Sequence, residues 1–318
     1  MTKPFAGLIA MAFAATCWLG PAPAAAQAAP AVAPVSAADD AAWRRDLSAW
    51  RAQREHELAA PDGWLTLIGL EWLKPGVNSF GSAADNRIQI HAQAPEHMGL
   101  LTLSGTTLQL LAPNGGFPPD LKIDGQAARE GQLSADNAKP STIAWHGLTL
   151  LVLLRGDRYA LRIKDADSPT RTGFQGLHWY APDARFRVTA EWTPFNPPRT
   201  EHIPTVLGTT LDMPSPGVAE FKIDGVTYHL APVVEDPSGK ELFFILRDQT
   251  SATTTYPAAR FLHTGVPDHG LAEPGVLTLD FNRLESPPCA YTSYATCPLP
   301  PELNRLKVAL EAGEQRYH

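Results

Sequence analysis

Short apolar runs separated by turn-forming residues dominate the chain after Gly63. Several runs end at turn formers such as Ser104-Gly105, Asp124-Gly125 and Arg155-Gly156-Asp157. Runs of this length between turns predict β-strands. We expect strands at 64–72, 86–90, 100–103, 107–111, 121–123, 141–144, 148–154 and 159–163. Their number and spacing predict a β-sandwich block over residues 63–170.

A second series of apolar runs follows a break near residues 165–173. It predicts strands at 185–192, 205–212, 219–223, 226–232, 242–248, 260–263 and 275–281. Because proline cannot donate to a β-ladder, the thirty prolines of the chain predict short or edge strands here. Leu303, Leu306 and Leu310 lie between Pro300-Pro301 and Gly313, which predicts a short terminal helix. We therefore expect residues 171–318 to form an antiparallel β block ending in a helix.

Helical spacing of apolar residues occurs once before these blocks, at Trp43, Leu47, Trp50 and Leu58. Asp39 and Asp40 can cap the start of a helix, and Pro61-Asp62-Gly63 can end it. This pattern predicts an amphipathic helix within residues 39–62. Its arginines are expected to form a solvated face; they are Arg44, Arg45, Arg51 and Arg54.

The N-terminus has the features of a secretory signal peptide, residues 1–26. Lys3 precedes an apolar run that is too short to span a bilayer, and Ala24-Ala25-Ala26 predicts cleavage near Ala26. Cys17 raises the alternative of a lipoprotein, against which the adjacent Thr16 argues. Residues 27–38 contain no charged side chain, and their Ala, Pro, Val and Ser composition predicts a disordered linker. We expect a periplasmic or secreted protein.

Composition narrows the possible partners. With 44% apolar residues, the chain can form one large or two small cores. No second segment of 18 apolar residues occurs, so no membrane span is expected after cleavage. The formal net charge is −7 and no basic block is present, so nucleic acid is not an expected partner. The oligomeric state is not predicted.

Cysteine and histidine usage bears on the chemistry of the chain. Cys289 and Cys297 form an even pair that predicts a disulfide in an oxidising compartment. The ten histidines show no His-x-His or His-Glu-x-x-His spacing, so neither a metal site nor a cofactor is expected. No Gly-x-Ser-x-Gly motif is present, and the sequence leaves open whether the protein is an enzyme.

Several motifs resemble the bacterial and archaeal family called domain of unknown function 1684, over roughly residues 43–317. The most specific are Leu279-Asp280-Phe281-Asn282-Arg283, Pro287-Pro288-Cys289-Ala290 and Ala295-Thr296-Cys297-Pro298-Leu299-Pro300-Pro301. The chain departs from the family pattern at Ala252, Pro257 and Ala259, where glycines are expected. The resemblance implies no established activity. Because similar cysteines occur in members without a signal peptide, it also allows a reduced pair that is buried, binds metal or performs redox work.

A weaker resemblance concerns the first β block. Gly76-Val77-Asn78-Ser79-Phe80-Gly81, Asn86-Arg87-Ile88-Gln89-Ile90 and Pro95-Glu96-His97 follow the order of a forkhead-associated sandwich. That fold reads phosphothreonine with an arginine after the glycine, where this chain has Ser82. The resemblance implies the sandwich and not phosphopeptide binding.

A candidate site lies in the second block. Leu277, Leu279 and Phe281 alternate with polar residues, so Asp280 and Asn282 project from the opposite face of a strand. One hypothesis is a pocket for a small anionic or polyhydroxylated ligand, closed by the loop between Cys289 and Cys297. Its expected ligand-binding residues are Arg260, Asp280, Asn282, Arg283, Tyr256 and Trp179. The alternative is a non-enzymatic structural or interaction module of the cell envelope, in which the same residues pair only with one another.

Overall fold

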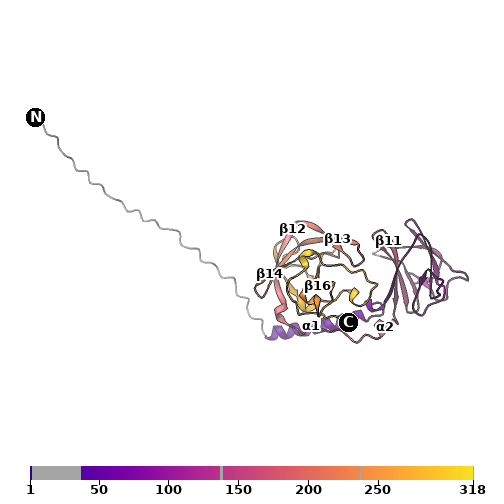
Figure 1. Ribbon diagram of the computed structural model, residues 1–318, viewed down its shortest axis with the longest axis horizontal. Helices are drawn as coiled ribbons and strands as arrows, with labels where there is room; N and C mark the ends of the chain where they lie inside the picture. The colour runs from indigo at the N-terminus through magenta and orange to yellow at the C-terminus, as the bar shows by residue number, and fades with distance from the viewer. Residues whose placement is uncertain (2–36, 137–138, 237, 318) are drawn as a thin grey trace.

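The structure, a computed structural model, describes residues 1, 37–136, 139–236 and 238–317. The predicted signal peptide, its cleavage site, Cys17 and most of the predicted linker lie outside these residues. The fold is mainly β with one long helix near the N-terminus, as the sequence predicts (Figure 1).

Helix α1 spans Ala37–Leu58 and buries one side against the second β block. Trp43, Leu47 and Leu58 are buried, whereas Arg44 and Arg45 are exposed. The expectation that all four arginines form a solvated face is wrong. Arg54 is largely buried and Arg51 is half-buried, because the Arg54 side chain reaches acceptors and the Arg51 side chain reaches the ring of Trp179 in the second block.

Eleven strands form a sandwich of two sheets. The six-stranded sheet has the order β1-β11-β10-β9-β6-β7, and the five-stranded sheet has the order β3-β2-β4-β5-β8. The strands are β1 Leu67–Trp72, β2 Gly76–Gly81, β3 Ile88–Gln89, β4 Gly99–Ser104, β5 Thr107–Leu111, β6 Lys122–Ile123, β7 Gln126–Ala127, β8 Gly131–Leu133, β9 Thr142–Trp145, β10 Leu148–Arg155 and β11 Arg158–Asp165. Alternate apolar residues of both sheets, such as Phe80, Leu101, Leu150 and Leu161, form one buried core.

Helix α2, Pro169–Thr172, leads into the second block, which contains two antiparallel sheets. The four-stranded sheet has the order β14-β13-β12-β17, and β15 pairs with β16. The strands are β12 Arg187–Pro204, β13 Thr210–Ile223, β14 Val226–Leu230, β15 Glu241–Leu246, β16 Arg260–Gly265 and β17 Gly275–Asp280. Trp192, Phe221, Phe244 and Phe281 lie in its core. Single-turn 3-10 helices join the strands; η1 is Trp64–Thr66, η4 is Phe281–Arg283 and η6 is Glu302–Asn304.

Two expectations for this block are wrong. The predicted terminal helix is confined to the 3-10 helix η6 at Glu302–Asn304, since Leu306 and Leu310 join the core from irregular chain. Proline does not shorten β12, which runs for 18 residues. Its pairing with β13 shifts register between Pro194 and Arg199, and this irregularity accommodates the prolines.

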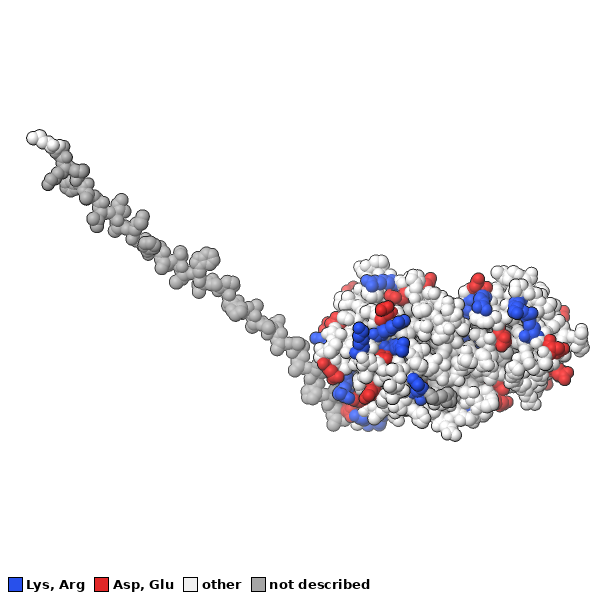
Figure 2. All heavy atoms as spheres, viewed as in Figure 1, with Lys and Arg blue, Asp and Glu red and all other residues white. Residues whose placement is uncertain are grey.

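The two blocks meet beside β1 and β11 (Figure 1). Leu67 of β1 packs in one cluster with Ile203, Phe243 and Phe261 of the second block. No helix in the described part of the chain is long and apolar enough to cross a membrane. On the face shown in Figure 2, basic and acidic side chains are interspersed over both blocks.

Candidate functional site

Arg260 lies inside the second block and lines none of the cavities described below. Its side chain has no exposed surface and forms an ion pair with Asp248. Its guanidinium also donates to the backbone carbonyls of Leu310 and Ala312. The residue therefore attaches the C-terminal segment to β16.

Asp280 and Asn282 belong to a different buried network. Asp280 Oδ2 accepts a hydrogen bond of 2.7 Å from the indole of Trp43, and Oδ1 accepts from the amide of Asn282. Asn282 also exchanges two hydrogen bonds of 2.9 Å with the backbone of Asp183. Arg283 lies 3.7 Å from Asp280 Oδ2 and pairs with Asp46 of α1. These contacts attach α1 and the chain near Asp183 to the end of β17.

The two predicted aromatic residues also have partners within the protein. The indole of Trp179 donates to Glu55 Oε1 at 3.0 Å, and the Arg51 guanidinium lies 4.8 Å from the ring centre. The Tyr256 hydroxyl donates to the carbonyl of Cys289 at 3.1 Å, while burial raises the pKa of Tyr256. The structure thus distributes the expected ligand-binding residues over separate contacts. Of these six, Arg283 lines a cavity between α1 and β16.

That cavity is part of a cleft whose floor is one face of the β15–β16 sheet. Phe261 exchanges two backbone hydrogen bonds with Glu285, so the segment after β17 extends this sheet. His263 lies two positions along β16 on the same face as Phe261, and Phe243 is its cross-strand partner. Register therefore gathers aromatic rings, an imidazole and a carboxylate on one surface.

Helix α1 and the disulfide-bonded loop form the walls of this cleft. A volume of about 510 Å³ lies between α1 and β16, and one of about 250 Å³ lies beside Trp64 and Cys297. Arg54, His263 and Glu285 line both volumes. A third volume, about 300 Å³, continues past Arg54 and Trp64 to Lys164 of β11. We call these three volumes, all of which Arg54 lines, the α1 cleft.

Arg54 is the central charge of the α1 cleft. Its Nε lies 3.3 Å from Glu285 Oε2 and 3.8 Å from Glu314 Oε2, and Nη2 donates to the carbonyl of Ser286 at 2.9 Å. Burial raises the pKa of Glu285, and Arg54 opposes this rise. Burial likewise raises the pKa of Glu314, which accepts a hydrogen bond from the Tyr291 hydroxyl.

His263 provides the second polar group on the cleft floor. Its ring stacks on Phe243 with centroids 4.6 Å apart, and Nδ1 lies 3.7 Å from Glu241 Oε1. Burial lowers the pKa of His263, although Glu241 and Glu235 oppose this shift. Burial raises the pKa of Glu235, which lines the same volume. The imidazole is thus favoured in its neutral form, which can both donate and accept a hydrogen bond.

Within the described ranges, no three His, Cys, Asp or Glu side chains are grouped so that they could hold a metal ion. The side chains that line the α1 cleft offer hydrogen-bonding and aromatic contacts.

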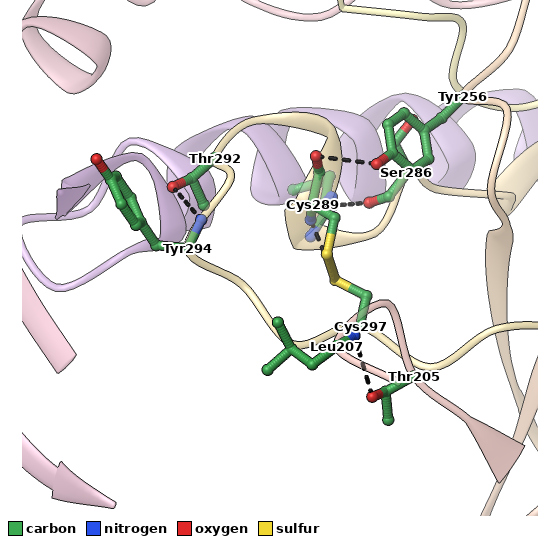
Figure 3. The surroundings of a disulfide bond; sticks show 9 residues. Thr205, Leu207, Tyr256, Ser286, Cys289, Thr292, Tyr294 and Cys297 are labelled. Carbon is green, nitrogen blue, oxygen red and sulfur yellow. Dashed lines mark hydrogen bonds between the residues drawn. A yellow bond between two sulfur atoms is a disulfide. The ribbon is translucent and has the colours of Figure 1, made fainter. Parts of the chain in front are cut away.

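The predicted disulfide between Cys289 and Cys297 is present, with Cα atoms 6.2 Å apart. Figure 3 shows it closing the loop that carries Thr292 and Tyr294, with Thr205 and Leu207 on a neighbouring turn beside Cys297. The backbone amide of Val206 in that turn donates to the carbonyl of Cys297. Cys297 lies in the wall of the α1 cleft, whose lining on this side includes none of the predicted ligand-binding residues.

Sequence reasoning missed Arg54, His263 and Glu285 as site residues. Alternation along β16 could have placed His263 on the face of Phe261. No local signal brings Glu285 opposite Phe261 or turns Arg54 toward both, because these contacts join segments that are far apart in the chain.

Residues 172–315 match the family described as "Protein of unknown function (DUF1684)". An uncharacterized protein of Haloarcula marismortui, solved in solution, is 32% identical over 46% of this chain and 80% of that one, with a TM-score of 0.39. No curated protein matches.

Two solved structures of FHA domains are also similar. The FHA domain of FhaA, solved in complex with an intracellular domain, is 13% identical over 30% of this chain and 97% of that one. A structure from work on phosphothreonine-dependent FHA domain interactions is 14% identical over 31% of this chain and 96% of that one. Both have a TM-score of 0.21.

Proposed function

Since the chain belongs to the DUF1684 family of proteins of unknown function, we propose its function from the site: the α1 cleft binds a small polyhydroxylated ligand such as a sugar. The observation that carries this proposal is the convergence of Arg54, His263 and Glu285 on the same two cavities. A guanidinium, an imidazole and a carboxylate together can donate to and accept from several hydroxyl groups.

The charges that line the cleft favour a neutral ligand over an anionic one. Two arginines, Arg54 and Arg283, line the two volumes over the sheet. Four carboxylates line them as well, those of Glu57, Glu235, Glu241 and Glu285. Both arginines are already paired with carboxylates, Arg54 with Glu285 and Arg283 with Asp46. An anion would meet uncompensated acidic groups here, whereas hydroxyl groups can donate to them.

Aromatic side chains complete the site. Trp50, Trp64, Phe243 and Phe261 line the volumes over the sheet. Their flat apolar surfaces suit the C–H faces of a sugar ring, while the charged groups suit its hydroxyls.

A thermal-shift titration tests the proposal. Glucose, N-acetylglucosamine and trehalose serve as neutral probes, and glucuronate serves as an anionic one. We expect at least one neutral sugar to raise the Tm more than glucuronate does. A ligand at about 100 times its Kd would add about 2.7 kcal/mol to the free energy of unfolding.

Two variants and two matched controls locate the binding. Glu285→Gln and His263→Ala should each abolish most of the shift, because they remove groups that line the cleft. Glu273→Gln and His91→Ala change exposed residues outside it and should leave the shift intact. No shift with any sugar, or equal shifts in all four variants, would favour the alternative of a structural or interaction module.

A further inference from the structure

Besides Arg54 in the α1 cleft, a second partly buried arginine lies on the first block, Arg162 in the middle of β11. Its neighbours Leu161 and Ile163 face the core of the sandwich, so Arg162 projects from the opposite face, toward the second block. The guanidinium lies 5.4 Å from the ring centre of Trp64. Trp64 itself lines the α1 cleft.

Arg162 lacks the partners that a half-buried guanidinium requires. Within the residues that the structure describes, its guanidinium donates no hydrogen bond, and its buried Nε has no acceptor. None of the ion pairs in this part of the chain includes it. A buried donor without an acceptor destabilises the fold, and a charged one does so more strongly.

The charges nearest to Arg162 are also positive. Burial and Arg155 together lower the pKa of Arg162 to about 10. Lys164 lies two positions further along β11 on the same face, and burial and Arg162 lower its pKa, against the opposing effect of Asp62. Arg155 donates to the carbonyl of Leu154, and Lys164 Nζ donates to the carbonyl of Asp62.

Burial of an arginine stem over apolar residues is a common structural role, and it accounts for part of this arrangement. Leu151 and Leu153 of β10 lie on the same face. This role explains the position of the stem of Arg162. It provides neither an acceptor for the buried Nε nor a counter-charge beside two further cations, whose repulsion raises the free energy of the folded state.

We propose that Arg162, together with Lys164 and Arg155, binds a phosphate-type oxoanion on this face of the sandwich beside Trp64. An oxoanion offers the several acceptors that a guanidinium fork and an ammonium group need. The site lies on β10 and β11, whereas the acidic floor of the α1 cleft lies on β15 and β16. Lys164 and Trp64 also line the third volume of the cleft, but the proposal does not depend on sugar binding at the floor.

Isothermal titration with inorganic phosphate tests the site, with chloride adjusted so that the ionic strength stays constant. Glucose 6-phosphate in a parallel titration distinguishes a phosphate ester from free phosphate. We expect saturable binding that Arg162→Gln weakens by at least about tenfold, because the variant removes charge-assisted hydrogen bonds. Arg158→Gln is the matched control, since Arg158 lies exposed on the same strand and stacks on Trp72.

The Tm of Arg162→Gln without phosphate shows whether the variant is folded; we expect no loss, since a repelling charge is removed. Glu285→Gln should keep its phosphate affinity and so separates this site from the acidic floor of the α1 cleft. The proposal is overturned if the wild-type protein binds neither anion, or if Arg162→Gln and Arg158→Gln bind phosphate equally well.

Discussion

At the scale of single residues, Arg260 shows how a charge can stabilise this fold from inside the core. It is one of the largest fully buried side chains in the described residues. Burying an ion pair is costly unless further hydrogen bonds satisfy the charged groups. The carboxylate of Asp248 and the carbonyls of Leu310 and Ala312 provide three acceptors. These contacts account for the buried position of Arg260 without a bound ligand.

We predict that Asp248→Ala lowers the free energy of unfolding by about 3 to 5 kcal/mol, because it leaves the guanidinium of Arg260 buried without its counter-charge. Urea unfolding measures the loss. Asp212→Ala is the control, since it removes an exposed partner of His202 and should cost at most about 1 kcal/mol. Equal losses in the two variants would contradict the prediction, because the buried pair of Arg260 and Asp248 would then contribute no more to stability than the exposed pair of His202 and Asp212.

At the scale of elements, α1 determines much of the candidate site. Its apolar spacing predicts both the helix and the buried positions Trp43 and Leu47. The same pattern cannot predict the direction of Arg51 and Arg54. Their partners, among them Trp179 and Glu285, come from segments more than a hundred residues away.

We predict that Trp43→Phe destabilises the protein by about 1 to 3 kcal/mol. The change preserves an apolar ring but removes the indole donor, so the buried Asp280 Oδ2 loses a hydrogen bond of 2.7 Å. Trp50→Phe is the comparison, because Trp50 is only half-buried and contacts Trp179 through its ring. In thermal unfolding, Trp43→Phe should have a lower Tm than Trp50→Phe. A lower Tm for Trp50→Phe would contradict a structural role for the indole hydrogen bond of Trp43.

At the scale of the whole molecule, local patterns predict the mainly β fold because strands and turns have short-range signals. Those signals miss two-residue strands such as β7, and they miss the length of β12, where a register shift overrides proline. The candidate site is harder to predict. The sequence indicates the polar residues around Asp280, but the α1 cleft depends on pairing of Phe261 with Glu285 and on the approach of Arg54.

The loop closed by the disulfide between Cys289 and Cys297 contacts both blocks and forms part of the α1 cleft. Thr292 in its loop donates to the carbonyl of Leu67 in the first block, and the carbonyl of Cys297 accepts from Val206 after β12. The carbonyl of Cys289 accepts from Tyr256. The closed loop therefore holds together both blocks and one wall of the α1 cleft.

We predict that the double variant Cys289→Ser and Cys297→Ser has a free energy of unfolding about 2 to 3 kcal/mol lower than that of the wild type. The disulfide closes a short loop and so restricts the unfolded chain, and the variant loses this effect. A reductant should lower the stability of the wild-type protein toward that of the variant and leave the variant unchanged. A thiol count on denatured, unreduced protein provides the direct check. Two free thiols would contradict the disulfide, and the wall of the cleft would then carry a pair of reactive groups instead of a cross-link.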